Sequence, residues 1–387
     1  MKFAQRIESQ KAAHWATVHR LVAERESRGT PVIRLASGNP DLPTPPDIVE
    51  TLRESILDPL YHRYPFTFRT EIYQAVATYY KNRFDVQLNP ETEIHTFSGS
   101  QEGIGDVGLA LLERGDIGLV TDPAYGSHSR ATEFAEAEVY YLPLTAENNF
   151  LPNLAVIPAD VLAKARVLWI GYPHNPTGAI APLSFFEEVV TFAKRNDIIV
   201  VHDNAYAEIC FDGYVAPSFL AVEGAKEVGI ELNTLSKSHN MAGWRFGMAV
   251  GNQDIINALR LVNINHSMGM FGPVQLAAIE AMTGDQTWLA ERNAIYQRRR
   301  DIIVKGLRAA GLSVTTPKAT LYVWARIPDR FEGDGFEFSK LILEQTAVWI
   351  DSGPFYGPGG ERYIRCTVTV KDDVLIEAME KLKGLEF

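Results

Sequence analysis

Lys237 is the residue of this sequence whose type and position point most directly to chemistry. It follows the apolar run 231–234 and comes directly after Ser236. An amine in apolar surroundings loses its proton more easily than one in water, and it can then act as a nucleophile or form a Schiff base with a carbonyl compound. A lysine taken alone is more often a solvated loop residue, so the residues around it must decide between the two interpretations.

Two arginines and an aspartate accompany this lysine. Arg245 comes eight residues after Lys237, Asp203 follows the apolar run 198–202, and Arg365 lies on an alternating segment beside Cys366. An arginine can bind a carboxylate or a phosphate through two parallel hydrogen bonds. Each residue also has a structural interpretation: a surface salt bridge for Arg245, a turn or helix cap for Asp203, and an exposed strand position for Arg365.

The elements that must position these residues follow from an alternation of apolar and helical segments. This alternation predicts parallel βαβ units, and therefore an α/β fold with a mostly parallel central sheet flanked by helices. Ligands bind such sheets beyond the carboxyl ends of the strands, and polar groups do follow the apolar runs. The predicted strands are 93–97, 117–121, 138–142, 167–170, 198–202 and 231–234, and the helical patterns include 47–57, 69–83, 101–113 and 183–195.

The two ends of the chain predict a second, smaller unit of the α+β type. The Gly/Pro-rich stretch 38–46 cannot be regular helix or strand, because proline fixes φ and removes a donor, and we expect it to cross between the two units. We expect the charge run Arg298-Arg299-Arg300-Asp301 to be a solvated helix face. The elements predicted for the smaller unit are helix 6–28, a long helix from about 290, strands 321–327 and 363–370, and a helix from about 371.

Composition excludes several classes of protein. The chain has 387 residues, a formal net charge of −11 and 46% hydrophobic residues, which is typical of an ordinary globular protein with a sizeable core. The acidic balance argues against nucleic acid or an anionic membrane as a partner. Cys210 and Cys366 lie far apart, no spacing suggests a metal site, and neither a secretory signal nor a long apolar segment is present. We expect a cytoplasmic protein with reduced cysteines.

Four motifs together resemble those of class I aminotransferases, the fold-type-I family that uses pyridoxal phosphate. The similarity extends from Gly38 to Arg365, with the motifs in the order of that family. A narrower similarity to the LL-diaminopimelate and alanine aminotransferase branch rests on segments 62–68 and 99–103. The four motifs are Asn175-Pro176-Thr177-Gly178, Asp203-Asn204-Ala205-Tyr206, Ser236-Lys237 with Asn240-Met241-Ala242-Gly243-Trp244-Arg245, and Tyr363-Ile364-Arg365.

The resemblance implies roles for residues around the cofactor ring. Lys237 would hold pyridoxal phosphate as a Schiff base and then move protons as general base and acid. Asp203 would pair with the pyridinium nitrogen, and Tyr206 and Asn175 would hydrogen-bond the phenolic oxygen. Tyr125 would stack on the ring; without the family match, a half-buried core tyrosine is a serious alternative. Asn175 is equally suited to a turn, since Asn-Pro-Thr-Gly is good turn chemistry.

The resemblance also implies which residues bind the cofactor's phosphate. Ser100 and Gln101 open a predicted helix, whose N-terminus attracts anions, although a serine there is usually only an N-cap. Arg245 and Ser236 would add charge and donors, and Tyr64 would reach across from the neighbouring subunit of a homodimer.

The substrate would be bound mainly by a residue of the smaller unit. Arg365 would clamp the substrate α-carboxylate, joined by the backbone of Gly38 and by Asn175. No arginine in 262–271 suits a distal carboxylate, and Arg69-Thr70 departs from the Gly-Leu that relatives often carry there.

The resemblance implies an order of domains that the composition alone does not. A large cofactor domain, residues 47–285, would be inserted into a smaller one built from both chain ends, with residues 1–46 as an N-terminal arm and part of the small domain and 286–387 as its remainder. The implied enzyme moves an amino group between an L-amino acid and a 2-oxo acid, with diaminopimelate- or alanine-type substrates favoured.

Two alternatives stay open from the residues. A C–S β-lyase on the same fold would use the same lysine and the same electron sink. A non-catalytic regulator or binding module is disfavoured, because only about forty residues precede Gly38 and both Lys237 and Asp203 are present.

Overall fold

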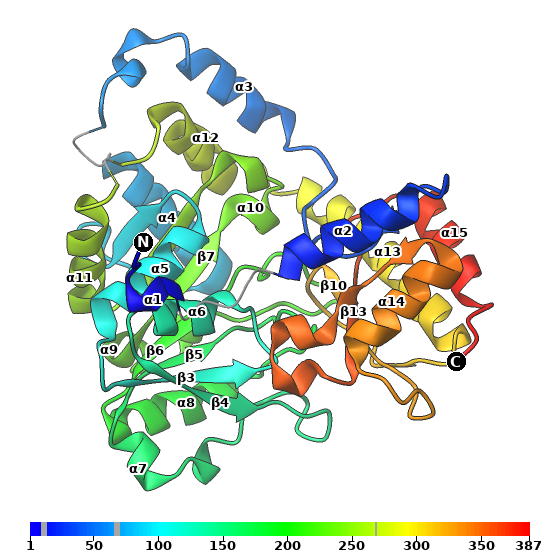
Figure 1. The fold of residues 1–387 in the computed structure, drawn as a ribbon. Coiled ribbons are helices and arrows are strands. Elements are labelled where there is room, and N and C mark those ends of the chain that lie inside the picture. Colours follow the sequence, from blue (N-terminus) through cyan, green and yellow to red (C-terminus); the bar gives the residue numbers. More distant parts are fainter. Residues whose placement is uncertain (9–13, 66–69, 268) are drawn as a thin grey trace.

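The computed structural model describes residues 1–8, 14–65, 70–267 and 269–387, and a seven-stranded sheet forms its centre (Figure 1). Its strands are β2 (Ile94–Phe97), β3 (Ile117–Asp122), β4 (Glu138–Pro143), β5 (Ala165–Ile170), β6 (Ile199–Asp203), β7 (Gly229–Thr234) and β8 (Gly247–Gly251). They run in the order β2-β8-β7-β6-β5-β3-β4. The neighbours from β7 to β4 pair in parallel, and β8 is antiparallel to both β7 and β2. The predicted α/β fold with a mostly parallel sheet is confirmed.

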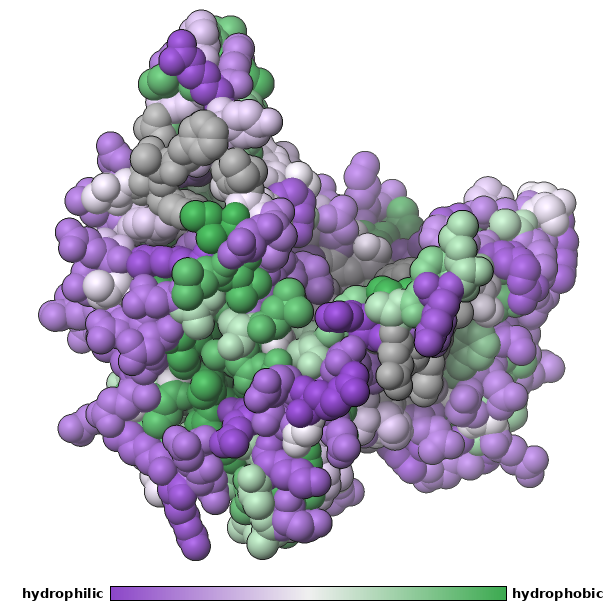
Figure 2. Space-filling model, turned by 60° about the vertical axis from the view of Figure 1, so that its left-hand side comes forward, coloured by the Kyte–Doolittle hydropathy of each residue, from purple (hydrophilic) through white to green (hydrophobic). Residues whose placement is uncertain are grey.

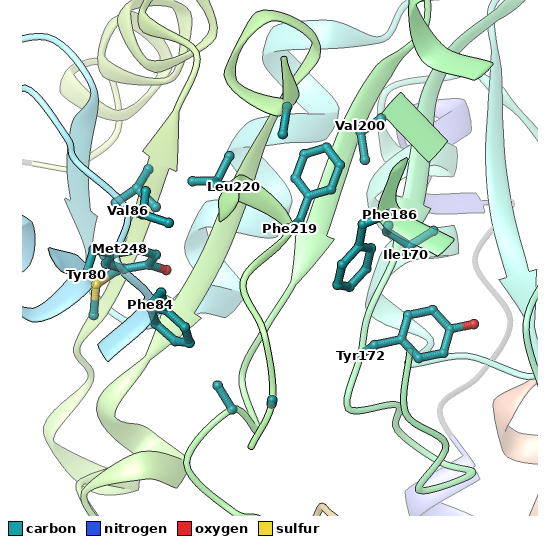
Figure 3. Packing of buried hydrophobic residues seen from close by; sticks show 14 of the residues in the cluster. Tyr80, Phe84, Val86, Ile170, Tyr172, Phe186, Val200, Phe219, Leu220 and Met248 are labelled. Atoms are coloured by element: carbon teal, nitrogen blue, oxygen red, sulfur yellow. The ribbon is translucent and has the colours of Figure 1, made fainter. Parts of the chain in front are cut away.

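Helices cover both faces of this sheet, which explains why its strands read as continuous apolar runs. Successive side chains of a strand point to opposite faces. In β5, Leu168 and Ile170 therefore join the core beneath α4 (Thr70–Phe84) and α8 (Leu183–Asn196), part of which Figure 3 shows. Val167 and Trp169 join the opposite core, beneath α5 (Ser100–Leu111) and α11 (Gln253–Ile264).

A smaller body lies beside the sheet and draws on both ends of the chain (Figure 1). Its four-stranded sheet has the order β12-β13-β10-β9, and a separate parallel pair joins β1 to β11. One core cluster contains Leu35 together with residues from Tyr296 to Leu382. The domain boundaries at residues 46 and 285 stay a prediction. The elements are β1 (Ile33–Arg34), β9 (Ser313–Val314), β10 (Tyr322–Arg326), β11 (Val348–Trp349), β12 (Asp351–Ser352), β13 (Tyr363–Thr367), α2 (His14–Glu26), α13 (Trp288–Ala309), α14 (Gly335–Thr346) and α15 (Asp372–Leu382).

The remaining elements are short or lie at the edges. In Figure 1, α3 projects from the large body and lies over α12, against which it packs. These elements are α1 (Gln5–Glu8), α3 (Pro46–Ser55), α6 (Ser127–Phe134), α7 (Ala159–Leu162), α9 (Ala225–Val228), α10 (Leu235–Ser238), α12 (Gly272–Thr283), and the 3-10 turns η1 (Pro59–His62), η2 (Leu154–Val156), η3 (Phe219–Ala221), η4 (Ala242–Trp244), η5 (Gly353–Tyr356) and η6 (Pro358–Gly360).

The predicted strands and helices agree with the structure to within a few residues where both exist. Strand β8 was not predicted, because its sequence Gly-Met-Ala-Val-Gly is short and begins and ends with glycine. Residues 9–13 of the predicted helix 6–28 lie outside the described residues, and the structure has α1 before them and α2 after them. Residues 66–69 also lie outside the described residues, and with them the departure at Arg69 and part of the segment 62–68.

The expectation that the charge run of α13 is solvated is wrong for two of its arginines. Arg299 and Arg300 are only 4% and 3% exposed. Arg299 pairs with Asp41 and Asp372, both at 2.9 Å, and Arg300 pairs with Asp212. Long arginine stems can bury their methylenes while the guanidinium finds a carboxylate. The pair with Asp41 ties α13 to the Gly/Pro-rich crossing segment.

Candidate functional site

Lys237 lies on the one-turn helix α10, directly after β7. Thr234 caps this turn, because its Oγ1 accepts a hydrogen bond from the Ser236 N–H at 3.1 Å. The Lys237 Nζ donates to the carbonyl oxygen of Gly38 at 2.7 Å. Burial lowers the pKa of Lys237, and Arg365 and Arg245 act in the same direction while Tyr322 opposes them. The amine therefore sheds its proton more readily than a lysine in water, as a Schiff-base lysine must.

Asp203 ends β6 on the face of the sheet that carries Trp169. Its Oδ2 lies 3.1 Å from Nε2 of His128, whose ring stacks on Trp169 with 5.1 Å between centroids. Its buried Oδ1 has no hydrogen-bond partner among the described residues. A buried carboxylate oxygen without a partner is costly, so this atom is suited to an added N–H donor. A protonated pyridine nitrogen is such a donor, and on this observation Asp203 fits pyridoxal phosphate.

Arg365 is buried between two aromatic rings. Its guanidinium carbon lies 3.8 Å from the ring centroid of Tyr322 and 4.5 Å from that of Tyr356. Its Nη2 donates to Asp351 at 3.0 Å and to the Ala36 carbonyl oxygen at 2.8 Å. Burial acts to lower the pKa of Arg365, but Tyr356, Tyr322 and Asp351 outweigh it and raise that pKa. The guanidinium is therefore held in place as a permanent cation.

The same arginine keeps donors for a ligand. Its Nη1 donates to Oδ1 of Asn175 at 2.9 Å, and its buried Nε has no partner among the described residues. The predicted exposed-strand interpretation of Arg365 is wrong, since the residue is 5% exposed. A planar guanidinium with an unused N–H is suited to a carboxylate.

Tyr206 and Tyr322 connect the two bodies of the protein. Their hydroxyl groups share a hydrogen bond of 2.9 Å, and both side chains are buried. Tyr206 follows β6 in the large body, while Tyr322 begins β10 in the smaller one. A methyl group in place of the Gly38 hydrogen would overlap the Tyr322 hydroxyl group, so Gly38 leaves room for this tyrosine.

Polar groups gather where α5 begins. Gly99 precedes the helix with φ +93°, and a side chain there would overlap the Arg245 guanidinium. A side chain at Gly247 would overlap the backbone N of Ser100, so the two backbones lie close together. Gly247 also pairs with Thr234 across the β7–β8 ladder. The Thr234 Oγ1 donates to the Ser236 Oγ at 2.9 Å. The helix N-terminus, one arginine and two serines thus meet here. Free N–H groups, a favourable dipole and a cation suit a phosphate.

Gln101 and Tyr125 are joined to each other rather than lying separately. The Tyr125 hydroxyl donates to Oε1 of Gln101 at 2.9 Å, and Ser127 donates to the same oxygen at 2.8 Å. The Tyr125 ring meets the His128 ring edge to face at 5.9 Å. Tyr125 is thereby fixed next to the Asp203–His128 pair, where a stacked cofactor ring would require it.

Tyr64 follows η1 and is exposed. It lines an open pocket of about 280 Å³ together with His62, Arg63, Pro65, Gly269 and Phe271. The predicted reach of Tyr64 into a neighbouring site stays a prediction.

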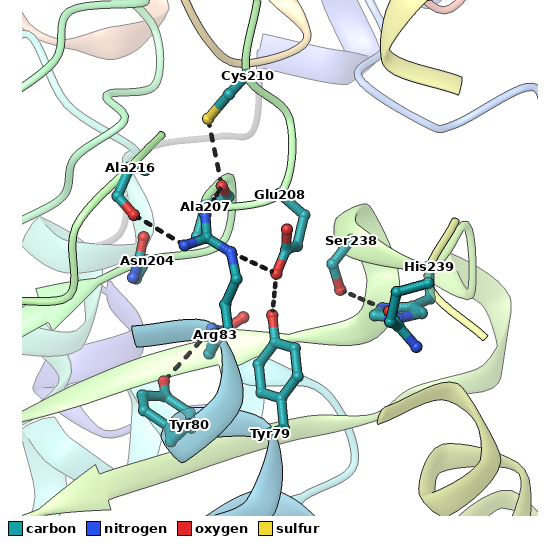
Figure 4. A network of polar contacts seen from close by, with 12 residues as sticks. Tyr79, Tyr80, Arg83, Asn204, Ala207, Glu208, Cys210, Ala216, Ser238 and His239 are labelled. Carbon is teal, nitrogen blue, oxygen red and sulfur yellow. Dashed lines mark hydrogen bonds and ion pairs between the residues drawn. The ribbon is translucent and has the colours of Figure 1, made fainter. Parts of the chain in front are cut away.

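The loop after Tyr206 is anchored by a buried carboxylate (Figure 4). Glu208 accepts hydrogen bonds from Tyr79 at 2.6 Å and from Arg83 at 3.0 Å, both on α4. The Glu208 carbonyl oxygen accepts from Arg292 of α13 at 2.6 Å. Two helices, α4 and α13, therefore hold this loop, which helps to fix the position of Tyr206.

The sequence did not single out His128, Tyr322, Asp351 or Tyr356, although all four lie in the site. His128 is brought to Asp203 only by the fold, and no spacing marks it. Tyr322 could have been found from the strand register, because Trp324 pairs with Arg365 and residues two apart on a strand share a face. Asp351 faces Arg365 in the same way, across the β12–β13 pair.

Two kinds of site are not found in the described part of the chain. Within it, no group of three or more His, Cys, Asp or Glu residues could hold a metal ion. None of its helices has both the length and the apolar character needed to cross a membrane.

Comparisons with known proteins agree with this geometry. The model of the family "Aminotransferase class I and II" matches residues 30–382. An LL-diaminopimelate aminotransferase from Dehalococcoides mccartyi is 46% identical over 387 residues, covering 100% of this chain and 99% of its own. Another from Moorella thermoacetica is 45% identical, covering 99% of this chain and 98% of its own. The structure of apo-BacF from Bacillus subtilis matches with a TM-score of 0.95 at 38% identity, covering 100% and 99% of the two chains.

Proposed function

The chain belongs to the class I and II aminotransferases, which use pyridoxal phosphate, and we propose that it moves an amino group between a diaminopimelate-type L-amino acid and a 2-oxo acid at the site around Lys237. The observation that carries the site assignment is a shared backbone segment. Lys237 donates to the carbonyl oxygen of Gly38, and Arg365 donates to that of Ala36. An α-amino acid carries its amine and its carboxylate on the same carbon, so it can reach a lysine and an arginine that meet on one short segment.

Pyridoxal phosphate, when bound, supplies the electron sink that stabilises negative charge at the substrate α-carbon. The substrate amine would take the place of Lys237 on the cofactor, and the freed Nζ of Lys237 would then accept the proton of the substrate α-carbon. Its lowered pKa supports this role, since the amine must be neutral to accept a proton. Asp203 would keep the ring nitrogen protonated through its unpaired Oδ1.

Other residues of the site would orient the two partners. Tyr206 and Asn175 would hydrogen-bond the phenolic oxygen, and Tyr125 would stack on the ring. Ser100, Gln101, Ser236 and Arg245 would hold the phosphate at the start of α5.

Arg365 would bind the α-carboxylate of the substrate, with Asn175 and the Gly38 backbone beside it. Because Arg365 belongs to the smaller body and Lys237 to the larger one, substrate binding would draw the two bodies together and exclude water.

The substrate proposal rests on the relatives. Two similar chains carry the name LL-diaminopimelate aminotransferase, and their match with this chain covers 98% to 99% of their length. Diaminopimelate carries an amino-acid group at each end, so one end would bind Arg365 while the other would extend away from it. Alanine is the alternative substrate, because it presents the same α-carboxylate and amine without a distal group.

We also propose a homodimer in which Tyr64 completes the neighbouring site. Figure 2 shows apolar residues gathered in a band on one face of the large body. Four large apolar side chains on α5 and α11 and directly before α12 are exposed, namely Leu109, Leu261, Ile264 and Phe271. Apolar surface of this kind is typical of a covered interface. Sedimentation equilibrium with wild-type protein and a Leu261→Glu variant tests the dimer; a wild-type monomer would contradict it.

The function is tested by following amino transfer directly. The enzyme is incubated with LL-diaminopimelate or L-alanine and a panel of 2-oxo acids, and new amino acids are measured by chromatography. Formation of the amino acid that corresponds to an added oxo acid is expected with LL-diaminopimelate, and no transfer from it would overturn the substrate proposal. Cystathionine without any oxo acid provides a second arm, in which abundant pyruvate would instead favour the C–S β-lyase alternative.

A further inference from the structure

Glu231 is a carboxylate at the centre of the large sheet that the proposed chemistry does not use. It lies on β7 and is 0% exposed. Its Oε1 accepts hydrogen bonds from the Tyr80 hydroxyl at 2.9 Å and from the Asn204 side-chain amide at 3.0 Å. Its Oε2 accepts from Ser218 at 2.9 Å and from the Phe219 N–H at 3.0 Å, and it lies 2.9 Å from Nδ1 of His202. Five groups from three segments of the chain therefore converge on one side chain.

The carboxylate is charged in these surroundings. Burial raises the pKa of Glu231, but the hydrogen bonds from His202, Asn204 and Ser218 outweigh it and leave that pKa below its ordinary value. A buried carboxylate is costly unless every acceptor position is used. Here each oxygen has two or more partners, so the charge holds those partners in one arrangement.

One of these partners leads to the turn that carries Asn175. The Nε2 of His202 lies 3.2 Å from the backbone N and 3.0 Å from the carbonyl oxygen of Tyr172. Tyr172 comes three residues before Asn175 in the turn after β5. Glu231 therefore fixes the orientation of the His202 ring, and that ring fixes the start of the Asn175 turn.

A second partner leads to the turn that carries Asp203 and Tyr206. Asn204 directly follows Asp203, and its side chain is held by Glu231 while its backbone N–H donates to Leu232 of β7 at 2.8 Å. His202 and Asp203 are consecutive in a strand, so they point to opposite faces of the sheet. Glu231 thus binds the residue before Asp203 and the residue after it. It does so from the face of the sheet opposite to the Asp203 side chain.

We propose that Glu231 is a positioning residue for the cofactor site, because its buried carboxylate holds His202 and Asn204 and thereby sets the turns that carry Asn175, Asp203 and Tyr206. The role rests on the proposed function, since it acts only through the residues that would bind the cofactor. Glu231 itself touches neither cofactor nor substrate.

A purely structural role for Glu231 makes a different prediction. If the carboxylate only stabilised the core, its loss would lower the melting temperature and leave cofactor binding unchanged in the folded protein. If it positions the two turns, its loss also weakens cofactor binding and loosens those turns in the apoprotein. The two roles are separated by measurements on folded protein.

The test compares Glu231→Gln with Ser218→Ala. The glutamine has the same shape but turns an N–H₂ group toward donors, whereas Ser218→Ala removes one donor from Oε2 and leaves the contacts of Glu231 with His202 and Asn204 in place. The dissociation constant of pyridoxal phosphate is measured by titrating apoprotein, and amide hydrogen exchange is followed in residues 171–178 and 203–207. For Glu231→Gln we expect a dissociation constant that is larger by roughly tenfold, and faster amide hydrogen exchange in both turns. Ser218→Ala is expected to stay within about twofold of the wild type.

A wild-type dissociation constant and wild-type exchange in folded Glu231→Gln would overturn the positioning role, even if its melting temperature falls. If Glu231→Gln does not fold, Asn204→Ala and Tyr80→Phe replace it, since each removes one donor from Oε1. Asn204→Ala must then weaken cofactor binding more than Tyr80→Phe, and equal effects would overturn the proposal. If the wild-type protein itself does not bind pyridoxal phosphate, the proposed function is wrong. If the wild-type protein binds it and Glu231→Gln binds it equally well, only the positioning role is wrong.

Discussion

The Lys237 amine donates a hydrogen bond of 2.7 Å to the carbonyl oxygen of Gly38. The two residues belong to different parts of the protein, since Lys237 follows a strand of the large sheet and Gly38 lies in the segment that crosses from the smaller body. Gly38 in turn packs against Tyr322, whose ring supports Arg365. One backbone segment therefore contacts the lysine, the arginine and one tyrosine of the pair, and it brings them close together.

Replacing Gly38 tests this packing. In Gly38→Ala the new methyl group would overlap the Tyr322 hydroxyl group, so either the crossing segment or Tyr322 must move. We expect kcat/KM to fall by at least about tenfold, because a misplacement of about 1 Å can cost more than that. Gly105→Ala on α5 is the matched control, since a methyl group there meets nothing within 4 Å, and it should retain activity. Equal kinetics for the two variants would contradict the packing argument.

The carboxylate clamp is tested by Arg365→Lys. A lysine keeps the charge but cannot donate to Asn175, Asp351 and a substrate carboxylate at the same time. We expect a loss of about 2 kcal/mol of transition-state binding, roughly 30-fold in kcat/KM, seen chiefly as a higher KM. Arg362→Lys is the control, because Arg362 directly precedes the strand that carries Arg365 but donates to the Gly333 and Pro328 carbonyl groups. A KM unchanged in Arg365→Lys would exclude a role in carboxylate binding.

Asp122 predicts a specific pH dependence of stability. It ends β3, and both of its carboxylate oxygens accept from the Gly359 N–H of the smaller body, at 3.0 and 2.9 Å. Burial raises the pKa of Asp122 from 3.8 to about 6, although the Gly359 hydrogen bond opposes the shift. The folded state thus binds this proton more tightly than the unfolded state, so its contribution to stability falls as the pH rises from about 4 to about 6.

Asp122→Asn removes this titration and keeps an acceptor for Gly359. The free energy of unfolding of the variant minus that of the wild type should therefore increase between pH 4 and pH 6 and stay constant above pH 6. Chemical denaturation across this range measures the difference. A difference that does not change with pH, or that decreases, would show that the pKa of Asp122 is not raised in the folded protein.

The sequence predicted the framework of the site better than its interior. Continuous apolar runs identify strands that are covered on both faces, and the polar residues after them were correctly expected at one edge of the sheet. The first residues of the motifs, such as Asp203 and Lys237, could be placed because they follow such runs. Strand β8 escaped because Gly247 and Gly251 weaken a strand pattern.

Residues that join the site only through tertiary contacts could not be predicted. His128 lies 75 residues before Asp203, and Tyr322 lies 116 residues after Tyr206, so no local spacing marks either pair. The buried Arg299 looked like part of a solvated face, because the carboxylate of Asp41 that compensates it is distant in sequence. The cytoplasmic location, the homodimer and the domain boundaries stay predictions.

The central claim is that Lys237 carries the cofactor, and borohydride reduction tests it most directly. Reduction of the enzyme with bound pyridoxal phosphate fixes the cofactor to whichever lysine holds it, and peptide mapping by mass spectrometry then locates the pyridoxyl group. We predict that the group is found on Lys237, and that Lys237→Ala loses both this label and the visible absorbance of the enzyme. A pyridoxyl group on another lysine of the wild-type protein, or none at all, would contradict the account.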